Sequence, residues 1–106
     1  MCESAALRDG GAAVRFDLIA DGRIASAFVI RHGGRVYGYL NRCAHVAMEL
    51  DWLPGQVFDA EGRFLICATH GAVYEPADGR CVEGPCTGRG SLVALTVVES
   101  GGTVYW

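Results

Sequence analysis

The stretch from Asn41 to Glu75, NRCAHVAMELDWLPGQVFDAEGRFLICATHGAVYE, contains two closely spaced Cys/His pairs. The first pair is Cys43-Ala44-His45 and the second is Cys67-Ala68-Thr69-His70, with 21 residues between His45 and Cys67. Two thiolates and two imidazoles supply enough ligands for one metal site around which a small domain can fold. We therefore expect the rest of the chain to be a scaffold for these four residues.

Length and composition indicate a soluble globular protein of one domain, residues 1–106. The chain is 51% hydrophobic and 20% charged, with a formal net charge of -3, which excludes a disordered chain. No run of Lys and Arg is present, so nucleic acid and anionic membranes are disfavoured as partners. The first 16 residues, MCESAALRDGGAAVRF, lack an export signal, and no apolar run approaches the roughly 18 residues that span a bilayer. We expect a cytoplasmic location.

Five cysteines are present, at positions 2, 43, 67, 81 and 86. In a reducing compartment they are expected to be ligands and buried thiols, and the odd number agrees with this. Cys81 and Cys86 lie five residues apart, so a disulfide or a fifth ligand stays open, but buried free thiols are favoured. Glu49 and Asp51 are expected to be solvated.

The pattern of glycines and β-branched residues predicts an all-β fold of short antiparallel strands. Gly-containing turns such as Gly33-Gly34, Asp78-Gly79 and Gly101-Gly102 separate apolar runs at fairly even intervals. The predicted strands are 13–18, 24–31, 36–40, 63–67, 72–75, 91–99 and 103–106, with a hairpin turn at Asp78-Gly79 and a closing hairpin across Gly101-Gly102. A single helical turn is the most that 44–53 could form.

The motif C-x-H followed by C-x-x-H-G resembles the signature of the Rieske 2Fe-2S family, in which one iron takes two Cys and the other two His. The resemblance covers nearly the whole chain and includes VYEPADGRC after the second pair, and Gly84-Pro85, which matches the proline loop that covers a Rieske cluster. It implies a sandwich or incomplete barrel with a cluster-binding subdomain, about 41–86, inserted in a β scaffold. It also implies that Cys43 and Cys67 bind the buried iron, and His45 and His70 the outer iron, of one 2Fe-2S cluster.

Three non-ligand positions separate the chain from the high-potential branch of that family. Ala72 replaces a serine that hydrogen-bonds to the cluster, and Met48 and Thr69 stand where a disulfide ties the two loops. Tyr74 matches a tyrosine that donates to a ligand sulfur. We therefore predict a midpoint potential in the lower half of the Rieske range of roughly -150 to +300 mV.

The resemblance implies a one-electron carrier and not an enzyme, because protein ligands fill every terminal position of such a cluster. The implied partners are a reductase and an acceptor, foremost the terminal component of an aromatic-ring-hydroxylating oxygenase, and the carrier is expected to be a monomer. Docking is expected at the exposed edges of His45 and His70, next to the apolar side chains of Val46, Met48, Trp52 and Pro85. Two alternatives stay open: a Rieske subunit bound permanently to a larger oxidoreductase, and a zinc-stabilised interaction module.

Overall fold

A computed structural model describes residues 1–20, 22–43, 49–51, 53, 55–68, 71–84 and 90–106. Within this part of the chain the structure is built almost entirely from strands in three antiparallel sheets, which confirms the expected all-β class. The elements are β1 (Cys2–Glu3), the 3-10 helix η1 (Ser4–Ala6), β2 (Val14–Ala20), β3 (Arg23–His32), β4 (Arg35–Leu40), β5 (Leu65–Ile66), β6 (Val73–Tyr74), β7 (Cys81–Glu83), β8 (Ala94–Leu95), β9 (Val98–Ser100) and β10 (Thr103–Tyr105). Among the described residues, no helix has the length and apolar character that crossing a membrane requires.

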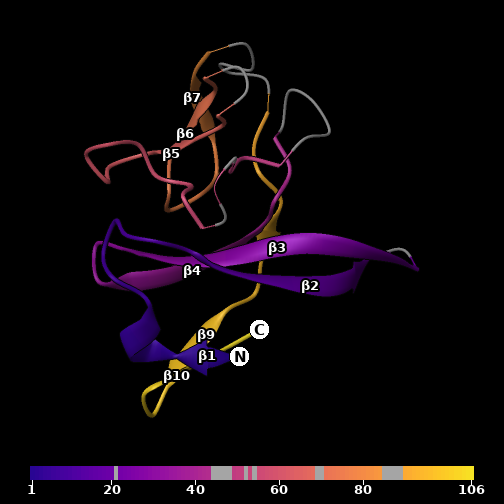
Figure 1. Cartoon of the computed structure of the whole chain (residues 1–106), viewed down its shortest axis with the longest axis vertical. Helices are drawn as coiled ribbons and strands as arrows, with labels where there is room; N and C mark the ends of the chain where they lie inside the picture. Colours follow the sequence, from indigo (N-terminus) through magenta and orange to yellow (C-terminus); the bar gives the residue numbers. More distant parts are fainter. Residues whose placement is uncertain (21, 44–48, 52, 54, 69–70, 85–89) are drawn as a thin grey trace.

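A four-stranded sheet with the order β2-β3-β4-β8 forms the middle of the molecule (Figure 1). Its first three strands confirm the prediction for residues 13–40, with β3 pairing along its whole length with β2 and then β4. The tight turn between β3 and β4 uses Gly33 and Gly34 at φ +60° and +80°. Both of their N–H groups donate to the carboxylate of Asp9, at 3.1 and 2.7 Å, so an N-terminal side chain fixes this turn.

The prediction of one strand over 91–99 is wrong, because this segment divides between two sheets. β8 pairs with β4, whereas β9 pairs with β10 in a second sheet of order β1-β10-β9. The chain changes sheets at Thr96 and Val97, and a Cβ added at Gly38 would collide with Val97 Cγ2. Glycine at position 38 is therefore what lets Val97 cross over β4. The closing hairpin of β9 and β10 is as predicted.

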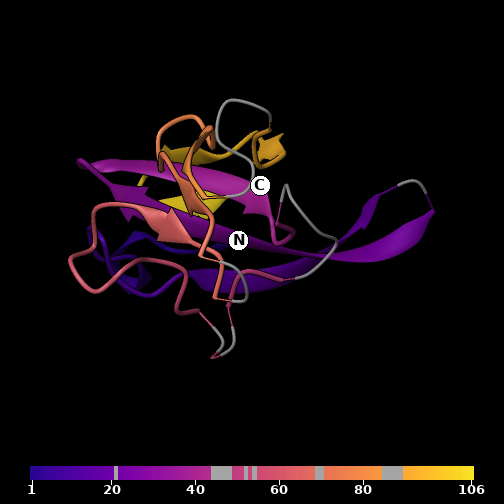
Figure 2. The same cartoon turned by 90° about the horizontal axis from the view of Figure 1, so that it is seen from above.

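We call residues 41–91 the loop-rich lobe, and its described residues lie on the opposite side of the four-stranded sheet from β1, β9 and β10 (Figure 1; seen from above in Figure 2). The lobe contains the sheet β5-β6-β7. The predicted strands at 63–67 and 72–75 are confirmed, in shorter form, as β5 and β6. The predicted turn at Asp78-Gly79 joins β6 to β7, with Gly79 at φ +74°. Most of 44–53, where a helical turn was considered, lies outside the described residues.

Successive side chains of β3 pack alternately into two hydrophobic cores, one on each face of the sheet, because side chains of a strand alternate between its two faces. Phe28 and Ile30 are fully buried in a core shared with Leu50, Leu65 and Tyr74 of the loop-rich lobe. In between, Val29 packs with Leu7 and Val104 in a second core beneath the sheet. The four-stranded sheet is therefore the middle layer.

Contacts between backbones also fix the loop-rich lobe to the sheet. The Ala13 N–H donates to the Gly55 carbonyl at 2.8 Å. Gly10 and Gly62, both at positive φ, approach so closely that a Cβ added at Gly10 would lie 2.7 Å from the Gly62 carbonyl oxygen. No side chain fits between these two loops.

Candidate metal centre

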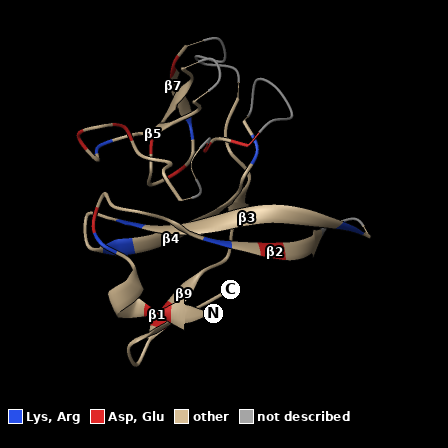
Figure 3. Ribbon diagram, viewed as in Figure 1, with Lys and Arg blue, Asp and Glu red and all other residues tan. Residues whose placement is uncertain are grey.

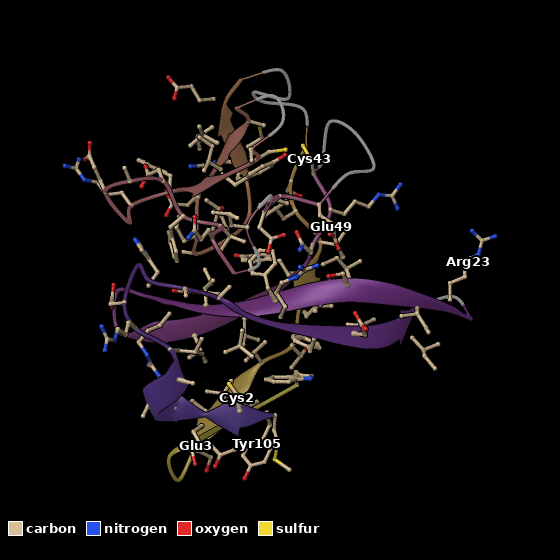
Figure 4. The ribbon with its side chains drawn as sticks, in the orientation of Figure 1. Cys2, Glu3, Arg23, Cys43, Glu49 and Tyr105 are labelled. Atoms are coloured by element: carbon tan, nitrogen blue, oxygen red, sulfur yellow. The ribbon has the colours of Figure 1, made fainter. Side chains whose placement is uncertain are left out.

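The structure brings the two expected cysteine ligands into one core. Cys43 follows β4 and Cys67 follows β5 directly, and their exposed fractions are 3% and 0%. Both belong to the core that also contains Ala72 and Tyr74, and neither is in a disulfide. In Figure 4, Cys43 lies in the loop-rich lobe, well away from the four-stranded sheet. His45 and His70 lie outside the described residues, so their positions stay predictions.

The second ligand pair occupies the connection between β5 and β6. The Cys67 N–H donates to the Ala72 carbonyl at 2.8 Å, and the Cys67 carbonyl accepts from the Gly71 N–H at 2.9 Å. Gly71 adopts φ +70°, which turns the chain back toward β6. Two backbone hydrogen bonds on one residue therefore fix where the Cys67 side chain leaves the backbone.

Tyr74 makes a side-chain hydrogen bond to an expected ligand, Cys43. Its hydroxyl lies 3.1 Å from Cys43 Sγ, and both side chains are buried. A thiolate has no proton to donate, so with Cys43 in the ligand state the phenol is the donor. The expected contact between a tyrosine hydroxyl and a cysteine sulfur is confirmed.

Gly84, directly after β7, packs against Ala72, which follows the second ligand pair. Residue 72 is an alanine and therefore has no hydroxyl to donate, and it is fully buried. Gly84, at φ +93°, lies against it, and a Cβ added there would be 2.9 Å from Ala72 Cα. This agrees with the covering role expected of Gly84-Pro85, whereas Pro85 itself lies outside the described residues, as do Met48 and Thr69. The expected docking residues Val46, Trp52 and again Met48 also lie outside them.

The base of the first ligand loop is closed by a buried polar network that the sequence did not reveal. Asn41 Nδ2 donates to Asp51 Oδ1 at 2.8 Å, and Asn41 Oδ1 accepts from the Leu50 N–H at 2.9 Å. Asp51 Oδ2 accepts from the Gly55 N–H at 2.8 Å. The expectation that Asp51 is solvated is wrong, because these donors replace water around its carboxylate.

Arg15 on β2 supplies the positive charge next to this network. Its Nη2 lies 2.8 Å from Glu49 Oε2, and its Nε lies 3.5 Å from Asp51 Oδ2. Glu49, labelled in Figure 4 between Cys43 and the sheet, is therefore paired and not merely solvated. A single Arg, Asn or Asp has no periodicity that sequence reasoning could use, so only the fold reveals this group.

Cys81 departs from the favoured expectation of a buried free thiol. It is buried, as expected, but it is disulfide-bonded. Cys86 lies outside the described residues. The expectation of a free thiol was based on the assumption of a reducing compartment. The redox state of the compartment does not determine whether the fold brings two sulfurs within bonding distance. Cys81 pairs across the sheet with Tyr74, so the disulfide is anchored opposite the tyrosine that contacts Cys43.

The described part of the site fits an iron–sulfur centre. Two buried thiols on adjacent loops are ligands suited to iron in a cluster or to zinc. A hydroxyl directed at one sulfur is an outer contact of the kind that adjusts the potential of a redox-active cluster. Hydrogen bonds at the bases of the two loops position both cysteines.

Comparison with known proteins gives a consistent result. A family model described as the Rieske [2Fe-2S] domain matches residues 1–100. The chain is 27% identical to the ferredoxin of carbazole 1,9a-dioxygenase from Nocardioides aromaticivorans IC177, with a TM-score of 0.69, covering 96% of this chain and 88% of that one. No curated protein matched the chain.

Two further solved structures share the fold at lower identity. One is a complex of reduced oxygenase and oxidized ferredoxin in carbazole 1,9a-dioxygenase, in which the matched chain has 24% identity and a TM-score of 0.76, with 99% of this chain and 96% of that one covered. The other is the terminal oxygenase of carbazole 1,9a-dioxygenase from Novosphingobium sp. KA1, with 23% identity and a TM-score of 0.77, covering 96% of this chain. The present chain spans only 27% of that oxygenase chain.

Proposed function

The chain belongs to the Rieske [2Fe-2S] domain family, and from this we propose that it carries single electrons from a reductase to an oxygenase component. One observation supports this most: a ferredoxin of similar size matches 96% of the chain, and both expected cysteine ligands lie in one buried core. The chain is then an electron carrier and not itself an enzyme, with a cytoplasmic location. We also propose that residues 1–106 form one domain, with 41–86 as the cluster-binding part.

The proposed ligands are Cys43 and Cys67 on the inner iron and His45 and His70 on the outer iron. When bound, the cluster supplies a centre that gains or loses one electron without an open position for substrate. The protein holds the two cysteines through the hydrogen bonds at each loop base and directs the Tyr74 hydroxyl at Cys43 Sγ. Burial of both sulfurs leaves the loop tips, where the histidines stand in sequence, as the side that faces a partner.

The charge distribution supports a partner with a positively charged docking surface. Residues 41–91 contain four arginines and seven acidic residues, so the loop-rich lobe carries a net charge of -3, while the rest of the chain is balanced. Figure 3 shows acidic residues on several sides of the lobe. Complementary charge increases association rates at low salt. We therefore expect electron transfer to the acceptor to slow as ionic strength rises.

Spectroscopy of the purified protein tests the proposed function. The protein should be reddish brown, contain two irons per chain for one cluster, and give a reduced EPR signal whose average lies below the free-electron value. Cys67→Ser should abolish the colour and the signal, because a thiolate ligand is lost. Cys2→Ser, at the opposite end of the molecule (Figure 4), is the matched control and should retain both. A colourless protein with stoichiometric zinc would overturn the proposal in favour of an interaction module.

A further inference from the structure

Both ligand loops are attached to the backbone of a single residue, Leu50. Its N–H donates to Asn41 Oδ1 at 2.9 Å, and Asn41 begins the segment that contains Cys43. Its carbonyl accepts from the Ala68 N–H at 2.9 Å, and Ala68 directly follows Cys67. Leu50 is fully buried. The peptide groups of Leu50 therefore set how the two cysteine-bearing loops lie relative to each other.

The carboxylate of Asp51 determines which way the Asn41 amide points. The side chain of Asp51 is 0% exposed, and its two oxygens accept from different donors, Asn41 Nδ2 and the Gly55 N–H. An ionised carboxylate has acceptors only, so it binds the NH₂ end of Asn41 and leaves the carbonyl end for Leu50. With Arg15 Nε at 3.5 Å, a cation adjoins the buried charge.

We propose that Asp51 is a positioning residue for the metal centre: through Asn41 its carboxylate orients the Leu50 backbone, and through Leu50 it fixes both ligand loops. This inference rests on the proposed function for the identity of the metal centre. The hydrogen bonds themselves are a property of the folded chain. Asp51 touches neither cysteine in this scheme and acts only through its neighbours.

Exchanging the Asp and Asn side chains between positions 51 and 41 distinguishes the positioning role of Asp51 from a general effect of its buried charge. Asp51→Asn places an NH₂ group against one of two donors, so one hydrogen bond is lost. Asn41→Asp places two carboxylates against each other. The double variant restores the three hydrogen bonds, with the donor reversed only between positions 41 and 51: the new carboxylate at position 41 accepts from Leu50 and from the new amide at position 51, whose oxygen accepts from Gly55. Glu49→Gln is the matched control, because it removes a neighbouring carboxylate that bonds to Arg15 and not to Asn41.

Three properties are measured for each variant: the rate of cluster loss to a chelator, the g-values of the reduced cluster, and the hydrogen-exchange rates of the backbone amides of Glu49–Asp51. For Asp51→Asn we expect about tenfold faster cluster loss, as one lost buried hydrogen bond implies, with shifted g-values and faster exchange. Asn41→Asp should show at least as large a change, because two carboxylates then face each other. The double variant should return to within about twofold of the unmodified protein, on the same basis. Glu49→Gln should match the unmodified protein.

Several results would overturn the inference. They are a single Asp51→Asn variant that behaves like the unmodified protein, a double variant that recovers nothing, or a Glu49→Gln variant that loses its cluster as fast as Asp51→Asn. If the single variants do not fold, recovery in the double variant still decides the question. If the unmodified protein binds no iron, the proposed function fails, whereas amide exchange at Leu50 in the unmodified protein and the four variants still tests the role of Asp51.

Discussion

Replacing Tyr74 by phenylalanine removes the hydroxyl that lies 3.1 Å from Cys43 Sγ and leaves the buried ring in place. The hydrogen bond withdraws negative charge from the sulfur and is stronger when the centre carries the extra electron. Its loss destabilises the reduced state more than the oxidised state. The midpoint potential of Tyr74→Phe should therefore be lower than that of the unmodified protein.

The size of the shift follows from the strength of a hydrogen bond to a charged acceptor, about 1.5–3 kcal/mol net. Only the part that differs between the two redox states changes the potential. A difference of roughly 1 kcal/mol corresponds to about 40 mV, because about 1.4 kcal/mol is a tenfold change in equilibrium and about 59 mV for one electron. We expect the midpoint to fall by about 40 mV.

Redox titration followed by visible absorption measures this shift, and Tyr39→Phe is its control. Tyr39 is equally buried, and its hydroxyl donates to the Pro76 carbonyl at 2.6 Å, not to a cysteine. Burial raises the pKa of this hydroxyl, so it stays neutral. Tyr39→Phe should lower thermal stability and leave the potential unchanged. Equal midpoints for Tyr74→Phe and Tyr39→Phe would refute the reasoning.

Two further predictions concern the cluster cover and the scaffold. Ala72→Ser should raise the midpoint potential by about 40 mV on the same conversion, if its hydroxyl donates to the centre. Ala27→Ser, equally buried on β3, is the control. An unchanged midpoint for Ala72→Ser would show that the loop does not direct this side chain at the cluster. Glu99 has its pKa lowered from 4.5 to about 2, chiefly by its hydrogen bond with Arg31. The ionised Glu99 carboxylate therefore contributes fully to stability above pH 4.5, and this contribution is lost as the pH falls toward 2. In thermal unfolding, Glu99→Gln should be less stable than the unmodified protein at pH 7 and equally stable near pH 2. Glu61→Gln, in an exposed ion pair with Arg63, should show no such dependence.

The strands that the sequence predicted well are those that border a glycine turn. β3 and β4 are bounded by Gly22, Gly33 and Gly34, and their apolar runs identify them without any knowledge of the fold. The segment 91–99 has no such boundary where β8 ends and β9 begins. The alternation of apolar and polar residues continues through Thr96 and Val97, although β8 pairs with β4 and β9 pairs with β10. Such alternation indicates a strand but does not specify which strand it pairs with.

The candidate site shows the same division between local and long-range information. The two cysteines that share one core and the contact of Tyr74 with Cys43 were predictable, because the spacing of a motif can be read from the sequence. The role of Asp51 was not, because it depends on Asn41, Gly55 and Arg15, which are brought together only by folding. The disulfide at Cys81 likewise depends on where sulfurs meet in space.

The contact between Gly10 and Gly62 bears on how electrons leave this molecule. Some electron carriers swing a tethered head group between donor and acceptor, and this needs a flexible hinge. Here the two glycine loops touch backbone to backbone, and Ala13 and Arg15 bind the loop-rich lobe at separate points. The lobe has no room to pivot on the sheet at this contact. The proposed electron transfer therefore proceeds with the lobe fixed against the sheet at this contact, and its rate should not depend on a hinge motion here.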